Sequence, residues 1–340
     1  MLPTSLNTRR NFLKTSLFAT GAAMLGSAAL PRLSRAQDKP ARKSSAMSPN
    51  EFRDKLEGPI FSLPTPFTAD YAVDHDGIRN MVRRALNHGV PIFTLTAGNS
   101  LFDLLTYEEI KEVNRTLVEA VGDRGISIAA SNDWWTGQSV DFARYIESIG
   151  AHSLQVRIPT RAGGEDSIVD HYRAIADATR LPLVLHGNFS ETLLKKLIDI
   201  PSIVAMKEDI TLDYYIDRQV LFGERLAIFG GGAENRFLVA HPYGSRAFYS
   251  TYTTFAPDIS MQFWKHIQSG DTKAAVAHTL KYDYPFIKRF SHPFWHATTE
   301  YFGLAPRHMR PPMQTFTDAQ MADLKTFFDT QGLDPNRYKE

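Results

Sequence analysis

Pro201-Ser-Ile-Val-Ala-Met-Lys-Glu-Asp209 is a short apolar run that begins after a proline and ends in charged residues. Such a run is typical of a strand in a parallel sheet, because that strand is buried on both faces. Lys207 would then stand at the carboxyl end of the strand, where open sheets and barrels carry their chemistry. Burial lowers the pKa of a lysine and makes a neutral, nucleophilic amine accessible near neutral pH. The alternative is a solvated lysine paired with Glu208 or Asp209.

Seven further apolar runs of this kind precede and follow that segment, and amphipathic helical patterns separate them. The predicted strands cover residues 59–63, 91–96, 126–130, 153–158, 181–185, 203–206, 226–229 and 246–250. The intervening helices are predicted over residues 76–87, 107–121, 139–149, 168–179, 191–198, 211–221 and 234–241. Eight alternating strand–helix units indicate an α/β fold, a (β/α)₈ TIM barrel.

The chain divides into four segments by composition and pattern. Residues 1–36 resemble an export signal, and residues 37–57, rich in Lys, Ser and Pro, are predicted to be a flexible leader. The barrel is expected over residues 58–257. Residues 258–340 would hold the last barrel helix and a C-terminal helical appendage, with helices over 258–268, 272–289, 292–302 and 317–330.

The first segment predicts the destination of the protein. Thr8-Arg-Arg-Asn-Phe-Leu-Lys14 has the pattern of a twin-arginine signal, and Ser34-Arg-Ala36 suits a cleavage site. The apolar stretch between them, residues 17–30, is short for a membrane span. We therefore expect export in the folded state to the periplasm and no membrane attachment after the signal is removed. The alternative is a basic N-terminal tail.

Composition excludes several classes of partner and chemistry. The first 36 residues carry five basic residues and no acids, so removing them lowers the formal net charge from +1 to −4. A mildly acidic chain without basic blocks is a poor candidate for binding nucleic acid or anionic membranes. The absence of cysteine excludes disulfides, thiolate nucleophiles and cysteine-ligated metals.

The carboxyl ends of the eight predicted strands meet at one mouth of such a barrel. One lysine, one histidine, one arginine and several small polar residues gather there, which suits carbonyl chemistry on a small acid; we expect no cofactor and no metal. The candidate site residues are Lys207 and His186 for catalysis, and Thr65, Gly98, Asn99, Ser100, Trp134, Arg161, Asn188 and Ser250 for substrate binding.

Five motifs occur in a characteristic order along the barrel. They are Leu63-Pro-Thr-Pro-Phe67, Leu105-Thr-Tyr-Glu-Glu109, Ile203-Val-Ala-Met-Lys-Glu208, Gly244-Ser-Arg-Ala-Phe-Tyr-Ser250 and Arg310-Pro-Pro312. Their order and spacing resemble the dihydrodipicolinate synthase/N-acetylneuraminate lyase family of class I, Schiff-base aldolases. The resemblance implies that Lys207 forms the imine and that the protein is a homotetramer or homodimer.

Departures from the family pattern concern the substrate. The family's Gly-Thr-Thr-Gly-Glu loop, which holds the substrate carboxylate, falls at Ala97-Gly-Asn-Ser-Leu101. The tyrosine that relays protons falls at His186, and the tyrosine donated across the subunit interface falls near Arg161. The synthase's arginine for its second substrate falls near Glu191. We therefore do not expect a true dihydrodipicolinate synthase.

The leading hypothesis is a lyase, an aldolase or hydro-lyase, that acts on a 2-oxo acid or sugar acid. Lys207 would attack the ketone and His186 would serve as acid and base, because an unperturbed histidine titrates near neutral pH. The alternative for His186 is a structural histidine bonded to a backbone carbonyl. Asn99, Ser100 and Thr65 would hold the carboxylate, or serve only as loop and turn residues.

Two candidate residues would contact the rest of the substrate. Arg161 would bind a second acidic group, or form a surface ion pair. Trp134 would wall the pocket; its neighbour Trp135 would then point elsewhere.

Two other classes of function remain open. One is a non-catalytic periplasmic sugar-acid binding protein on the same barrel, which the altered loop at residues 98–101 favours. The other is a metal-dependent hydrolase, since His292 and His296 have a spacing that can hold Zn²⁺ on a helix. Two surface histidines are the better interpretation, because the pair lies outside the predicted barrel mouth.

Overall fold

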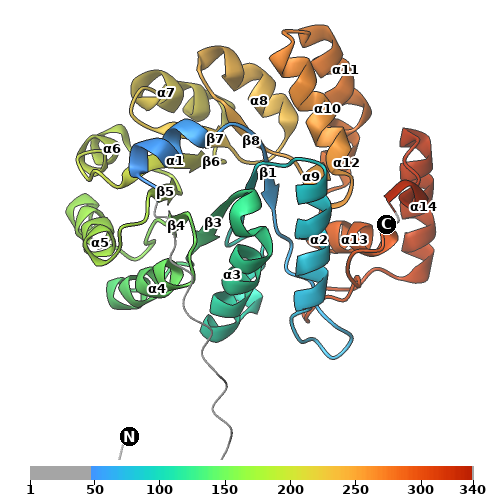
Figure 1. Ribbon diagram of the computed structural model, residues 1–340, viewed down its shortest axis with the longest axis horizontal. Coiled ribbons are helices and arrows are strands. Elements are labelled where there is room, and N and C mark those ends of the chain that lie inside the picture. The colour runs from blue at the N-terminus through green and yellow to red at the C-terminus, as the bar shows by residue number, and fades with distance from the viewer. Residues whose placement is uncertain (1–46, 339–340) are drawn as a thin grey trace, which may run out of the picture. The chain divides into compact units, whose positions relative to one another are not determined.

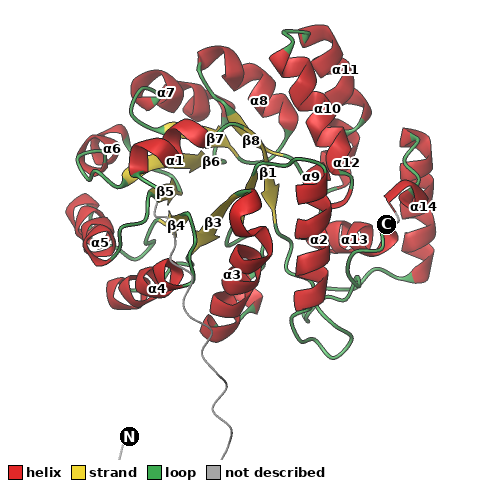
Figure 2. Ribbon diagram, viewed as in Figure 1, coloured by secondary structure: helices red, strands yellow, loops and turns green. Residues whose placement is uncertain are grey.

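The computed structural model describes residues 47–338, so the export signal and the first part of the leader lie outside the described residues. Eight parallel strands close into a barrel in sequence order. Figure 2 shows the strands at the centre of a ring of helices. The strands are β1 (Gly58–Ser62), β2 (Ile92–Thr94), β3 (Ile126–Ala130), β4 (Ser153–Arg157), β5 (Leu183–His186), β6 (Ile203–Glu208), β7 (Ala227–Gly230) and β8 (Ala247–Tyr249). The predicted (β/α)₈ barrel is confirmed.

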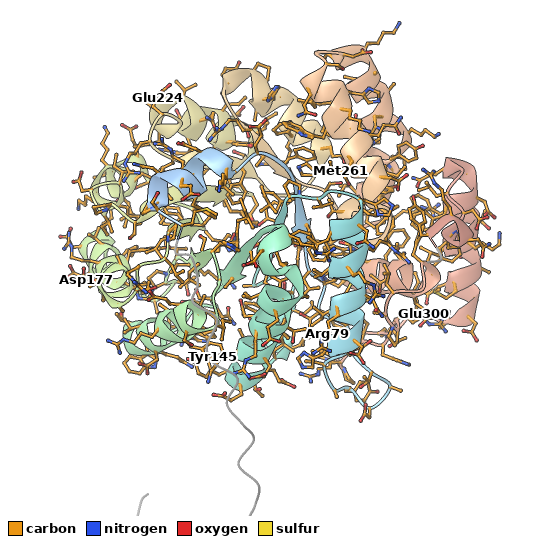
Figure 3. All side chains as sticks on the ribbon, in the orientation of Figure 1. Arg79, Tyr145, Asp177, Glu224, Met261 and Glu300 are labelled. Carbon is orange, nitrogen blue, oxygen red and sulfur yellow. The ribbon has the colours of Figure 1, made fainter. Side chains whose placement is uncertain are left out.

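The helices that follow the strands lie within a few residues of their predicted bounds (Figure 1). Thr106 and Glu109 form a capping box at the start of α3. In Figure 3, labelled Arg79, Tyr145 and Asp177 lie on the outer helices α2, α4 and α5. The helices are α2 (His75–Asn87), α3 (Tyr107–Val121), α4 (Thr136–Ser148), α5 (Glu165–Ala178), α6 (Glu191–Leu197), α7 (Leu212–Phe222) and α8 (Glu234–Ala240).

The prediction of a flexible leader is wrong for α1 (Pro49–Lys55). Ser48 caps this helix by accepting a hydrogen bond from the Glu51 backbone N–H, and Pro49 suits the first turn because it needs no donor there. Phe52 and Leu56 are buried with residues of the barrel interior. The helix therefore closes the end of the barrel where the strands begin.

The C-terminal appendage packs beside α2 (Figure 1). Arg84 of α2 donates hydrogen bonds to the carbonyls of Phe302 and Tyr338, at 2.9 Å each. Beyond β8 follow α9 (Tyr252–Phe255) and α10 (Pro257–Gln268), which matches the predicted last barrel helix. The appendage then consists of α11 (Thr272–Lys281), α12 (Asp283–Arg289), α13 (His292–Tyr301) and α14 (Asp318–Gln331). Of the helices in residues 47–338, none combines the length and apolar content needed to cross a bilayer.

The single helix predicted over residues 272–289 is in fact two, α11 and α12, which meet at Tyr282. Pro285 explains the break, because a proline cannot donate to the carbonyl four residues earlier and its ring crowds that carbonyl. That carbonyl belongs to Lys281, and the side chain of Gln331 approaches it at 3.4 Å instead. The break directs α12 and the following residues towards the barrel mouth.

Strand periodicity decides which side chains enter the barrel, because successive residues point to opposite faces. One interior layer is apolar and consists of Ile60, Ile92, Ile128, Val184, Ala205 and Phe229. Two residues further along β5 and β6, on the same inward face, stand His186 and Lys207, which are paired in the strand register. The side chains of the candidate site thus rest on a packed apolar floor.

Candidate active site

Lys207 has a buried amine surrounded by polar and aromatic groups. Its side chain is 6% exposed, and Nζ forms an ion pair and hydrogen bond with Asp209 Oδ2. Nζ also lies 3.1 Å from His186 Nε2 and 5.4 Å from the ring centroid of Tyr249. Burial lowers the pKa of Lys207, although the charge of Asp209 opposes the shift. The lysine is therefore easier to deprotonate than a solvated one.

The two neighbours of Lys207 have opposite protonation preferences. Burial, helped by the charge on Lys207, lowers the pKa of His186 to about 4. Burial alone would raise the pKa of Asp209, but its hydrogen bond with His186 and the charge of Lys207 outweigh burial, so its pKa lies well below its usual range. At neutral pH the imidazole is neutral and the carboxylate is ionised.

Gln155 fixes the orientation of the His186 ring. Its side-chain N–H₂ donates to the carbonyl of Leu95 at 3.4 Å and to His186 Nδ1 at 3.3 Å. Since Nδ1 accepts, a neutral His186 carries its proton on Nε2, from which it donates to Asp209 Oδ2 at 3.4 Å, and to Lys207 Nζ at 3.1 Å when that amine is neutral. His186 is thus arranged to donate a hydrogen bond at Nε2.

A cavity of about 300 Å³ opens onto Lys207. That volume is at the small end of the range for small-molecule sites. The lysine therefore has an acidic neighbour and also room for a ligand. The cavity is lined by Ser62, Asn99, Lys207, Asp209, Gly231, Gly232, Tyr249, Ser250, Thr251, Ile287, Phe290 and Trp295.

Of the residues predicted to bind substrate, Asn99 and Ser250 line this cavity. Asn99 donates to Ser62 Oγ at 3.2 Å, and Ser250 Oγ donates to Glu234 Oε1 at 2.8 Å. Thr65 and Ser100 lie behind the wall instead. The Thr65 hydroxyl donates to the Ser100 carbonyl and the Ser100 hydroxyl donates to the Leu63 carbonyl, both at 2.7 Å, so these two side chains hold the loop.

The remaining predicted contacts lie away from Lys207. Trp134 and exposed Arg161 line a second cavity of about 600 Å³, and Trp134 packs against Phe142 with ring centroids 4.9 Å apart. Gly98 and Asn188 are exposed and line neither cavity. The barrel brings together Lys207, His186, Asn99 and Ser250 but not these four residues.

Sequence reasoning missed several residues of the site: Ser62, Gln155, Arg157 and Tyr249. Asp209 was named as a partner of a solvated Lys207, whereas the structure pairs it with a buried one. Arg157 pairs with His186 in the register of β4 and β5, and its charge lowers the pKa of both His186 and Lys207. A signal was available, because polar residues at alternate positions of an otherwise apolar strand mark its inward face near the mouth.

The interpretation of His292 and His296 as two surface histidines is wrong for His296. This side chain is fully buried, and its ring stacks on Phe67 with centroids 6.2 Å apart. Burial lowers the pKa of His296 to about 3. Within residues 47–338, no group of three or more His, Cys, Asp or Glu side chains is arranged to hold a metal ion.

Comparison with known proteins agrees with this architecture. Residues 55–330 match the model of the dihydrodipicolinate synthetase family. A probable 5-dehydro-4-deoxyglucarate dehydratase of Streptomyces coelicolor is 30% identical over 66% of this chain and 74% of its own length.

Solved structures share the fold. The dihydrodipicolinate synthase of Oceanobacillus iheyensis has a TM-score of 0.75 at 19% identity, covering 84% of this chain and 99% of that one. YagE of E. coli K12, solved in complex with pyruvate, has a TM-score of 0.70 at 21% identity, covering 82% and 99%.

The family model spans most of the chain and includes the strand that carries Lys207. The chain therefore belongs to the dihydrodipicolinate synthetase family, and it is a lyase of the class I aldolase and dehydratase type.

Proposed function

We propose that this protein is an aldolase or hydro-lyase that acts on a 2-oxo acid through an imine at Lys207. The observation that supports the proposal most directly is the buried amine of Lys207, which faces a ligand-sized cavity and contacts a carboxylate. The dehydratase relative and the pyruvate complex of YagE support the choice of a 2-oxo acid.

The contacts of Lys207 suit each step of imine chemistry. The neutral amine attacks the ketone carbon, and loss of water from the adduct gives an iminium ion. That cation withdraws electrons from the adjacent carbon, so that a C–C bond or, after proton removal, a C–O bond breaks. Asp209 accepts protons from Lys207, and the His186 N–H donates to oxygen that develops charge.

The carboxylate end of the substrate would lie beside the loop after β2. Asn99 and Ser62 present an amide and a hydroxyl to the cavity, and both are neutral hydrogen-bond donors that suit a carboxylate. The family's threonine pair is absent here, and His186 stands where a tyrosine relays protons. These differences favour a reaction other than dihydrodipicolinate synthesis.

The cellular setting is part of the proposal. The twin-arginine pattern at residues 8–14 supports export, and a periplasmic enzyme would meet substrates taken up from outside the cell. Cell fractionation that finds the protein only in the cytoplasm would contradict this part. A homotetramer or homodimer is proposed from family membership, and light scattering on the purified protein tests it.

A substrate screen tests the reaction. Wild-type protein, Lys207→Ala and His186→Ala are incubated with pyruvate aldol adducts and sugar-derived 2-oxo acids, and the loss of substrate is followed by NMR. We expect turnover by wild type and none by Lys207→Ala. Tight binding that survives Lys207→Ala, without turnover by wild type, would instead indicate the sugar-acid binding protein.

A further inference from the structure

The cavity at Lys207 has two chemically different ends. Ser62, Asn99 and Asp209 surround the amine with polar atoms. The other end consists of apolar side chains from the segment after Pro285. These are Ile287 on α12 and Phe290, the residue that follows α12. Trp295 on α13 completes this apolar end, and its ring centroid lies 5.7 Å from that of Phe290.

The charges in the lining are already balanced. Among the described residues that line the cavity, the charged side chains are Lys207 and Asp209, and they pair with each other. Tyr249 remains a neutral phenol, because burial raises its pKa. A second substrate carboxylate at the apolar end would meet no cation, and a buried charge without a partner is strongly unfavourable.

Arg236, beside Gly232 of the lining, pairs with Glu208, and two further arginines near the mouth lie elsewhere. Arg161 lines the second cavity. Arg157 ends β4, which is opposite β8 in the strand order of the barrel, and its guanidinium donates to Asn132 Oδ1 at 3.3 Å. Neither side chain belongs to the lining of the Lys207 cavity.

Three neutral polar groups of the lining are buried without a hydrogen-bond partner among the described residues: the hydroxyls of Tyr249 and Thr251 and the indole N–H of Trp295. A hydroxyl of this kind suits an uncharged oxygen of a ligand, such as the alcohol of an aldol adduct.

We propose that the substrate is a 2-oxo acid whose far end is apolar, such as an aryl or branched alkyl group, seated against Ile287, Phe290 and Trp295. This inference rests on the proposed function, since the 2-oxo group must reach Lys207. It separates this chain from relatives named for glucarate-derived diacids, whose far end carries a carboxylate.

The test compares two 2-oxo acids of opposite character, 2-oxo-4-phenylbutanoate and 2-oxoglutarate. Each is titrated against wild-type protein with borohydride, and the adduct at Lys207 is quantified by mass spectrometry. Burial of a phenyl ring favours binding by about tenfold or more. We expect half-saturation at a concentration at least about tenfold lower for the phenyl acid.

Variants assign the preference to the apolar end. Ile287→Arg adds a cation there and should shift the preference towards 2-oxoglutarate, whereas Leu280→Arg on the exposed face of α11 should leave it unchanged. Should Ile287→Arg fail to fold, Phe290→Ala serves in its place and should raise half-saturation for the phenyl acid alone, because Phe290 is only half-buried.

Three outcomes would count against the inference in distinguishable ways. Equal trapping of both acids, or better trapping of 2-oxoglutarate, overturns the apolar far end while the imine stands. A preference for 2-oxoglutarate that Arg157→Ala removes would assign the far end to Arg157. Failure to trap even pyruvate would remove the proposed function itself.

Discussion

Lys207 Nζ and His186 Nε2 lie 3.1 Å apart on neighbouring strands whose register pairs the two residues directly. Burial lowers the pKa of both groups, and the charge of Lys207 lowers the pKa of His186 further. Asp209 contacts both nitrogens and balances the site with one negative charge. This trio has consequences that can be measured.

Asp209→Asn should lower the pKa of Lys207 further, because the carboxylate is the group that opposes the effect of burial. The pH profile of pyruvate trapping would then move to lower pH, by about one unit or more. Trapping rates measured across pH check this, with Asp213→Asn on exposed α7 as the control. A profile that coincides with that of wild type would contradict the electrostatic role of Asp209.

The pKa of His186 predicts acid sensitivity. Its value of about 4 in the folded protein lies below the unfolded value of 6.5, so only the unfolded chain binds this proton between those values. Stability is therefore full above pH 6.5 and falls as the pH drops towards 4, by roughly 3 kcal/mol at most from this residue. Urea unfolding at pH 7.5 and 4.5 should show a smaller loss for His186→Asn than for wild type. Equal losses would contradict the assigned cause.

The pKa of Asp283 predicts a contribution to stability that falls as the pH rises, opposite to that of His186. Burial raises its pKa to about 7, although backbone N–H groups of Glu234 and Asn235 oppose the shift. The folded protein holds a proton there that the unfolded chain releases near pH 4, so this contribution to stability is present below pH 4 and is lost as the pH rises through 7. The free energy of unfolding of Asp283→Asn minus that of wild type should therefore be larger at pH 8 than at pH 5. The increase should be a few kcal/mol in order of magnitude. Asp141→Asn on the surface is the control, and a pH-independent difference would contradict the prediction.

Phe52→Ala tests the helix that closes the barrel floor. Phe52 is fully buried with interior residues, so truncation should cost about 3–5 kcal/mol of unfolding free energy. Chemical denaturation measures the change, and Val220→Ala at an exposed position gives the baseline. A loss below about 1 kcal/mol would mean that α1 is not part of the folded core.

The barrel was predictable because each strand is a separate apolar run and several helices, among them α2, α3, α6 and α7, have their own N-cap. Lys207 was identified from the same signal, as a cation that ends such a run. The prediction of a flexible leader failed because the Lys and Pro content of the segment indicates disorder, while a single phenylalanine gives little signal. The burial of Phe52 depends on contacts with the barrel, which the leader sequence alone does not show.

The apolar residues of the cavity could not be predicted from the sequence around Lys207. Ile287, Phe290 and Trp295 reach the cavity from helices some 80 residues beyond Lys207, and only tertiary packing brings them there. Arg161 shows the reverse case: it follows a barrel strand, as a site residue should, yet the loop carries it into another cavity.

Borohydride reduction in the presence of pyruvate, followed by peptide mass spectrometry, tests the imine most directly. We predict a reduced pyruvyl adduct on the peptide that contains Lys207, absent without borohydride and absent in Lys207→Arg. No adduct on folded wild-type protein, or an adduct that persists in Lys207→Arg, would contradict the account.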